Sequence, residues 1–116
     1  DNLKRLVDLV GPAVTSDITF SARQLDSSEA LRVGLVQKIL DDNLHQFVDD
    51  YAVLISKNAP LTIKSMKFNI RETQKDQNDR NLEMVKLLVD NAFSSDDYIE
   101  GRTAFMEKRS PLFQGK

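Results

Sequence analysis

Residues 94–113 read SSDDYIEGRTAFMEKRSPLF, a stretch that carries both a start signal and a stop signal for one helix. Its first turns hold acidic side chains and its last turn holds basic ones, which is the charge order that the helix dipole favours. Pro111 then prevents the helix from continuing. The N-cap is expected at one of three neighbouring residues, Ser95, Asp96 or Asp97.

Gly101 lies inside this predicted helix. A glycine in a helix interior costs about 1 kcal/mol relative to alanine, so its presence needs a compensating reason. We expect that another backbone segment passes close to Gly101.

The rest of the chain predicts further short helices. Apolar residues at helical spacing, together with caps and prolines, mark helices over 2–10, 12–20, 26–34, 44–57, a segment that follows Pro60, and 81–93. The connection over residues 72–80 is polar throughout and is expected to be exposed, whereas residues 35–40 are partly extended. In the helix over 81–93 the residues expected to face inward are Leu82, Val85, Leu88, Val89, Ala92 and Phe93. The pattern predicts an all-α fold, a small orthogonal bundle of about five to six helices with at most one short extended segment.

Composition narrows the class of protein. The chain has 116 residues, 41% of them hydrophobic and 29% charged, which fits one folded domain. Sixteen basic against eighteen acidic residues argue against a module that binds nucleic acid by neutralising phosphates. There is no cysteine, and no apolar run reaches the length of a membrane span. We expect residues 1–116 to be a single helical domain and part of a longer chain.

No residue pattern predicts catalysis or metal binding by this chain. Its one histidine, His45, has no companion histidine or acid at ligand spacing. Most of the acidic residues near helix starts are explained as caps, and Ser94 and Ser95 lack a base. We therefore expect no catalytic residue and no metal ligand.

Three segments resemble one family. The run over 94–113, the run FSARQLDSSEALRVGLV over 20–36, and Asn58-Ala59-Pro60 followed by Lys67 are similar, in order and separation, to the C-terminal part of the enoyl-CoA hydratase/isomerase (crotonase) family. The resemblance covers most of the chain. It implies that this is the C-terminal helical domain of the crotonase fold.

The resemblance also implies a function. In that family, backbone N–H groups of an N-terminal spiral core form an oxyanion hole for the acyl-CoA thioester enolate, and carboxylates of the same core move the proton. That core is absent here, so we expect residues 1–116 to be inactive alone. The parent enzyme is expected to use acyl-CoA as its substrate, with no tightly bound cofactor, and to be cytoplasmic if bacterial and mitochondrial or peroxisomal if eukaryotic.

In many members of that family, the last helix contributes to CoA binding. The matching cofactor-binding positions are Phe105, beside the cofactor, and Lys108, near its phosphates. The alternative is that Phe105 is a core residue and Lys108 only complements the helix dipole. A family position that lines the acyl pocket falls near Val89, where a core residue is an equal expectation.

The expected partners are acyl-CoA and copies of the same chain. The resemblance implies a homo-oligomer, a trimer or a dimer of trimers, with neither nucleic acid nor membrane as a partner. The competing interpretation is a stand-alone helical interaction module that shares ancestry with the family but does not bind CoA.

Overall fold

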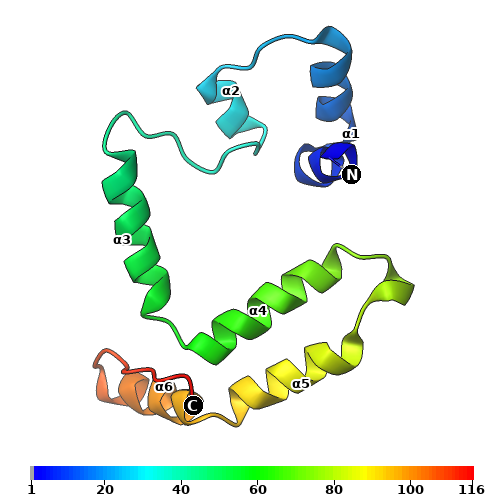
Figure 1. Ribbon diagram of the computed structural model, residues 1–116. Helices are drawn as coiled ribbons and strands as arrows, with labels where there is room; N and C mark the ends of the chain where they lie inside the picture. The colour runs from blue at the N-terminus through cyan, green and yellow to red at the C-terminus, as the bar shows by residue number, and fades with distance from the viewer. Residues whose placement is uncertain (1) are drawn as a thin grey trace. The chain divides into compact units, whose positions relative to one another are not determined.

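The computed structural model describes residues 2–116, and its regular elements are helices (Figure 1). No strand occurs over these residues, so the predicted all-α class is confirmed and residues 35–40 form a loop. In chain order the elements are α1 (Asn2–Ser21), α2 (Ser27–Arg32), α3 (Leu44–Ser56), α4 (Pro60–Thr73), the 3-10 turn η1 (Gln77–Asp79), α5 (Leu82–Phe93) and α6 (Asp96–Glu107).

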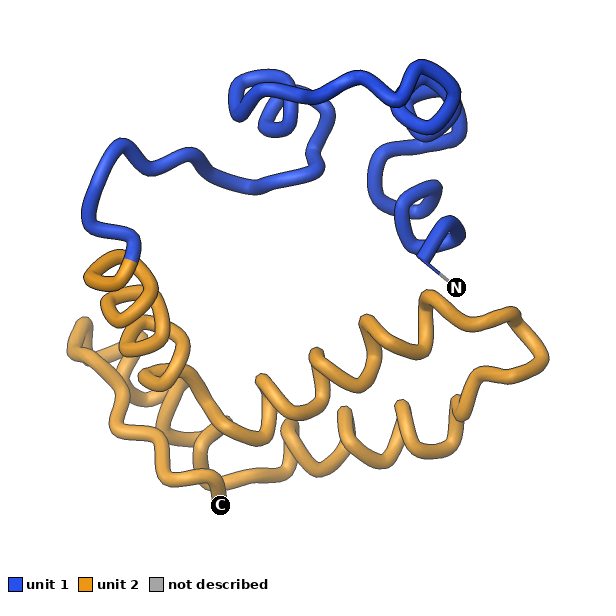
Figure 2. Tube along the Cα trace, turned by 45° about the horizontal axis from the view of Figure 1, so that its top comes forward, with its two compact units in different colours: residues 1–44 blue, residues 45–116 orange. Residues whose placement is uncertain are grey.

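The chain divides into two compact units, residues 1–44 and residues 45–116 (Figure 2). Unit 1 contains α1 and α2, and unit 2 contains nearly all of α3 and the later helices. The single domain that we expect over residues 1–116 stays a prediction.

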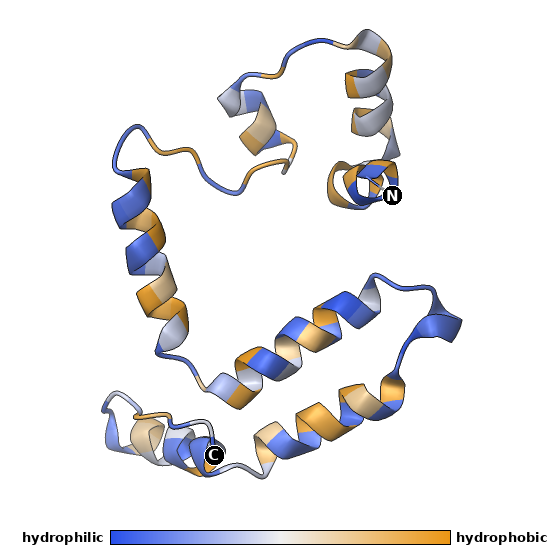
Figure 3. Cartoon of the chain, viewed as in Figure 1, coloured by the Kyte–Doolittle hydropathy of each residue, from blue (hydrophilic) through white to orange (hydrophobic). Residues whose placement is uncertain are grey.

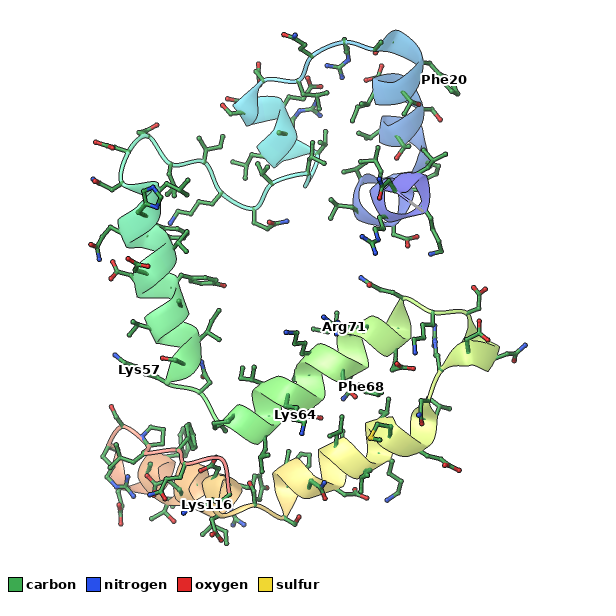
Figure 4. The ribbon with its side chains drawn as sticks, viewed as in Figure 1. Phe20, Lys57, Lys64, Phe68, Arg71 and Lys116 are labelled. Carbon is green, nitrogen blue, oxygen red and sulfur yellow. The ribbon has the colours of Figure 1, made fainter. Side chains whose placement is uncertain are left out.

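In unit 1, α1 consists of two helices joined at a kink, as the Gly11-Pro12 pair predicts. Gly11 has φ 81° and ψ 162°, a conformation open to glycine, and Pro12 follows it. The Thr15 hydroxyl donates to the Gly11 carbonyl oxygen at 2.8 Å, and Thr15 is buried. At the other end of α1 the Phe20 ring stands clear of the helix and is 87% exposed (Figure 4).

Helix α2 begins and ends where its caps predict. The Asp26 carboxylate accepts a hydrogen bond of 2.7 Å from the Glu29 backbone N–H, and Gly34 has φ 81° just after the helix. Arg23 bridges Glu29 and Asp17, each at 2.6 Å, so an ion pair joins the end of α1 to α2. The Arg23 guanidinium lowers the pKa of the Glu29 carboxyl.

In unit 2, α4 and α5 lie side by side and pack against each other (Figures 1 and 2). Glu72 joins the end of α4 to the start of α5, although the sequence pattern predicts that it lies in an exposed connection. It lies in the last turn of α4, is only 4% exposed, and its carboxylate accepts from the Asn81 backbone N–H at 2.7 Å. An ion pair with Lys75 and this hydrogen bond lower the pKa of Glu72. A charged side chain is buried here because the Lys75 ammonium group and the Asn81 backbone N–H satisfy its carboxylate oxygens.

The apolar stripes of unit 2 are largely exposed. Figure 3 shows hydrophobic residues along α3 and α5, yet no residue of α3 is buried. In α5 two residues that we expected to face inward are exposed, Leu82 at 64% and Phe93 at 61%. They lie at the two ends of the helix.

Candidate functional site

The predicted helix over the signature segment is α6, and Ser95 is its N-cap. The Ser95 hydroxyl accepts from the Tyr98 backbone N–H at 3.1 Å and donates to the Ala92 carbonyl oxygen at 2.8 Å. Because Ser95 takes the capping position, the neighbouring Asp97 carboxylate is available for other partners. Asp97 is 3% exposed, which is unusual for an aspartate.

Those partners are in residues 109–116, which we call the C-terminal strap. The strap turns back along α6, and the two oxygens of Asp97 accept from the backbone N–H groups of Gln114 at 2.7 Å and Gly115 at 2.8 Å. The Asp97 N–H donates in return to the Lys116 carbonyl oxygen at 3.2 Å. Asp97 therefore fastens the far end of the strap to the first turn of α6.

Glu100 fastens the near end. Its two carboxylate oxygens pair with the Arg109 guanidinium at 2.6 and 2.9 Å, and one of them also accepts from the Leu112 backbone N–H at 2.8 Å. Arg109 also reaches Glu107 at 2.6 Å. The Arg109 hydrogen bond, followed by the Leu112 one, lowers the pKa of the Glu100 carboxyl to about 2.

Gly101 makes room for this strap, but not in the way that we predicted. A Cβ atom built on Gly101 would lie 3.4 Å from Cε1 of the Phe113 ring, so a side chain and not a backbone segment makes the close approach. Further along the strap, a Cβ on Gly115 would lie 3.5 Å from Cβ of Pro60. The strap therefore contacts both α6 and the first residue of α4.

Phe105 lies in a cleft of about 390 Å³ beside the strap, which we call the Phe105 cleft. Its aromatic walls are Tyr98, Phe105 and Phe113, and Arg102 adds a cation over the Tyr98 ring, 5.8 Å from its centroid. Phe105 itself is 81% exposed, so within the described chain it is not a core residue. Arg102, one helical turn before Phe105, contributes to the positive charge of this segment but was not predicted as a cofactor-binding residue.

Lys108 follows α6 as its C-cap. Its backbone is left-handed, with φ 55°, a conformation that costs a non-glycine residue about 1 kcal/mol. The Lys108 N–H donates to the Phe105 carbonyl oxygen at 3.3 Å. The Arg109 N–H donates to the Ala104 carbonyl oxygen at 3.0 Å. Because α6 ends at Glu107, Lys108 does not continue the helical face of Phe105, and it is not among the residues that line the Phe105 cleft.

Val89 lies in a separate cavity of about 250 Å³ between α4, α5 and α6. The lining is mainly apolar, with the Ser65 hydroxyl on the α4 side. That hydroxyl is buried and has no hydrogen-bond partner in the part of the chain that the structure describes. Val89 is therefore a wall residue of an apolar cavity.

The described residues hold neither a metal-binding cluster nor a membrane-spanning helix. Across positions 2–116 no three histidine, aspartate or glutamate side chains are grouped so that they could hold a metal ion. None of the described helices has both the length and the apolar character needed to cross a membrane. His45 is exposed at the start of α3.

Known proteins share this sequence and this fold. The enoyl-CoA hydratase/isomerase family model matches residues 2–116. The chain is 33% identical over 113 residues to the Arabidopsis thaliana protein named "Probable enoyl-CoA hydratase 2, mitochondrial", covering 97% of this chain and 38% of that protein. It is 33% identical over 107 residues to the short-chain-enoyl-CoA hydratase of Clostridium acetobutylicum, covering 91% and 41%.

Among solved structures, the enoyl-CoA hydratase from Bacillus anthracis superposes with a TM-score of 0.82 at 26% identity, covering 98% of this chain and 45% of that one. This chain thus spans less than half the length of each of these relatives. Since the match extends over the whole described chain, the chain belongs to the enoyl-CoA hydratase/isomerase family.

Proposed function

We propose that this chain is the C-terminal helical part of an enzyme that hydrates or isomerises acyl-CoA thioesters, and that Phe105 and Lys108 contact CoA in that enzyme. The family match over residues 2–116 supports the first part. The named hydratases extend well beyond the matched region, which is where we place the oxyanion hole and the catalytic carboxylates. Residues 1–116 alone are then inactive.

The geometry of α6 supports the second part. CoA offers an adenine ring and several phosphates, which suit an exposed aromatic face and unpaired cations. Phe105 supplies the exposed ring. Arg109 is already paired with Glu100 and Glu107, whereas within the described residues no carboxylate pairs with Arg102 or Lys108. An exposed aromatic ring on α6, with one cation three positions before it and another three positions after it in the chain, is the observation that carries the proposal.

The test of the CoA contacts uses the intact protein and an acyl-CoA substrate. We expect Lys108→Ala to raise the Michaelis constant about threefold at an ionic strength near 0.01 M, and by less at high salt, because salt screens an exposed phosphate contact. Phe105→Ala should raise it to a similar extent at both ionic strengths, since the ring carries no charge.

Lys64→Ala is the matched control. Lys64 is an exposed lysine on α4 (Figure 4), and no carboxylate of residues 2–116 pairs with it. An unchanged Michaelis constant for both Lys108→Ala and Phe105→Ala, at either ionic strength, would contradict the proposed contacts. If the intact protein also bound no CoA, the interaction-module alternative would replace the enzyme proposal.

We also propose that the protein forms a homo-oligomer, a trimer or a dimer of trimers. Large apolar side chains are exposed on α3 and α5, and exposed apolar patches of this kind are typical of protein–protein contacts. Light scattering of the intact protein tests this proposal. A monomer mass at high protein concentration would contradict it.

A further inference from the structure

We propose that Asp97 and Glu100 are positioning residues for CoA binding: by fastening the C-terminal strap to α6 they fix the orientation of Lys108 and the wall of the Phe105 cleft. This inference rests on the proposed function. Neither carboxylate is expected to touch the cofactor, because the backbone N–H groups of the strap and the Arg109 guanidinium already occupy their oxygens.

The first step of the argument concerns Lys108, which is the hinge between α6 and the strap. Its left-handed backbone is unfavourable for a lysine and persists only where the surroundings impose it. The helix end supplies part of this constraint, because the Arg109 N–H donates to the Ala104 carbonyl oxygen at 3.0 Å. The strap adds to it, because Glu100 holds the Arg109 side chain through two hydrogen bonds of 2.6 and 2.9 Å. Without the Glu100 contact only backbone bonds hold this turn, so the direction of the Lys108 ammonium group would be less fixed.

The second step concerns the cleft. Phe113, which belongs to the strap, forms one of its aromatic walls and lies against Gly101. On the C-terminal side of Phe113 the strap is held by Asp97, and on the N-terminal side Glu100 accepts from the Leu112 N–H. The ring is thus clamped between two carboxylate contacts, so the loss of either contact would loosen the wall that faces Phe105.

The third step concerns Asp97, whose burial and hydrogen bonds fix its position. Asp97 is nearly fully buried, and each of its oxygens accepts one backbone N–H. An asparagine at this position would place an N–H group against one of those donors, so Asp97→Asn keeps the size of the side chain but removes one acceptor. The neighbouring Asp96 is exposed in the same helical turn, and its carboxylate has no partner among the described residues.

The experiment measures kcat and the Michaelis constant of the intact protein for an acyl-CoA substrate. We expect Asp97→Asn to raise the Michaelis constant about threefold with kcat unchanged, and Asp96→Asn, which removes the same charge from the same turn, to change neither. Glu100→Gln acts at the other end of the strap and should repeat the Asp97→Asn result, so one of the two variants remains informative if the other fails to fold.

A double-mutant cycle separates positioning from mere stability. If Glu100 acts through Lys108, and Asp97 acts through the cleft wall that faces Phe105, then Glu100→Gln in a Lys108→Ala background and Asp97→Asn in a Phe105→Ala background should each raise the Michaelis constant by less than about 1.5-fold. Fully additive effects, or a lower melting temperature with an unchanged Michaelis constant, would overturn the positioning role while leaving the CoA contacts intact. If Lys108→Ala and Phe105→Ala have no effect by themselves, the proposed function fails and this inference fails with it, a pattern that the other outcomes do not produce.

Discussion

Helices α3 and α6 are similar in length but are stabilised by different means. α3 has a regular apolar stripe, yet none of its residues is buried, and Leu54 is 59% exposed. α6 has a much weaker apolar stripe, yet Ala104 and Asp97 are 1% and 3% exposed. The difference is the C-terminal strap, which covers one side of α6 and is held there by carboxylates.

This comparison shows that amphipathic pattern and burial are separate properties. A stripe of apolar residues predicts a helix with one apolar face, but it does not specify which segment covers that face. Two acidic residues that accept backbone N–H groups specify a covering segment directly, because each donor has a fixed place in the chain.

The largest loss of stability in α6 is expected from Asp97→Ala, which removes the carboxylate that holds the far end of the strap. It leaves the N–H groups of Gln114 and Gly115 without acceptors in a part-buried place, which should lower the free energy of unfolding by about 2 to 3 kcal/mol. Denaturant titration of the intact protein measures this. Asp96→Ala is the control for the loss of a negative charge near the helix start, and an equal loss in both variants would show that the strap contacts contribute nothing.

The next largest loss of stability is expected from Gly101→Leu. Gly101→Leu would push branched carbons into the Phe113 ring and should lower the free energy of unfolding by about 1 to 2 kcal/mol. Gly101→Ala adds only a Cβ at ordinary contact distance and gains up to about 1 kcal/mol of helix propensity, so it should be neutral or stabilising. Equal melting temperatures for the two variants would mean that the ring does not lie there.

Acid should weaken α6 through Glu100. Its pKa in the folded chain is about 2, below the value of about 4.3 typical of an unfolded glutamate, so its stabilisation is fully present above that higher pH and is lost as the pH falls towards 2. The melting temperature of Glu100→Gln should therefore fall less than that of the wild type between pH 5 and pH 2. Glu83→Gln, in the first turn of α5, should keep the wild-type profile. Parallel profiles for all three proteins would rule out the Glu100 contribution.

The smallest effect is expected on α3. Leu54→Gln replaces an exposed leucine, so within residues 45–116 it should change the free energy of unfolding by no more than about 0.5 kcal/mol. In the intact protein it should weaken self-association if the α3 face takes part in the oligomer. Measured with a chain shortened to residues 45–116, a loss of several times that size would show that the stripe of α3 is covered within unit 2 itself.

Local rules predicted much of the fold from the sequence. The cap at Asp26, the break at Gly11-Pro12 and the start at Pro60 all depend on residues within four positions of one another, and the structure confirms each. Of the three candidates at the start of α6, only the geometry could select Ser95, because all three have suitable side chains.

The contacts of the candidate site depend on longer separations. Glu100 and Arg109 are nine positions apart, Asp97 and Gly115 eighteen, and no periodicity links residues on either side of a reversal at Lys108. The burial of Glu72, nine positions before Asn81, was missed for the same reason. Phe105 and Lys108 came from the family resemblance, whereas the place of Arg102 in the wall of the Phe105 cleft required the structure.

Amide hydrogen exchange in the strap tests the central claim most directly. If Asp97 and Glu100 hold residues 109–116 against α6, the N–H groups of Leu112, Gln114 and Gly115 should exchange far more slowly than that of Phe113, which donates to neither carboxylate. Asp97→Asn should then speed the exchange of Gln114 and Gly115 in particular. Exchange of all four amides at the rate of an unstructured peptide would contradict the account, because the strap would then be unfastened in solution.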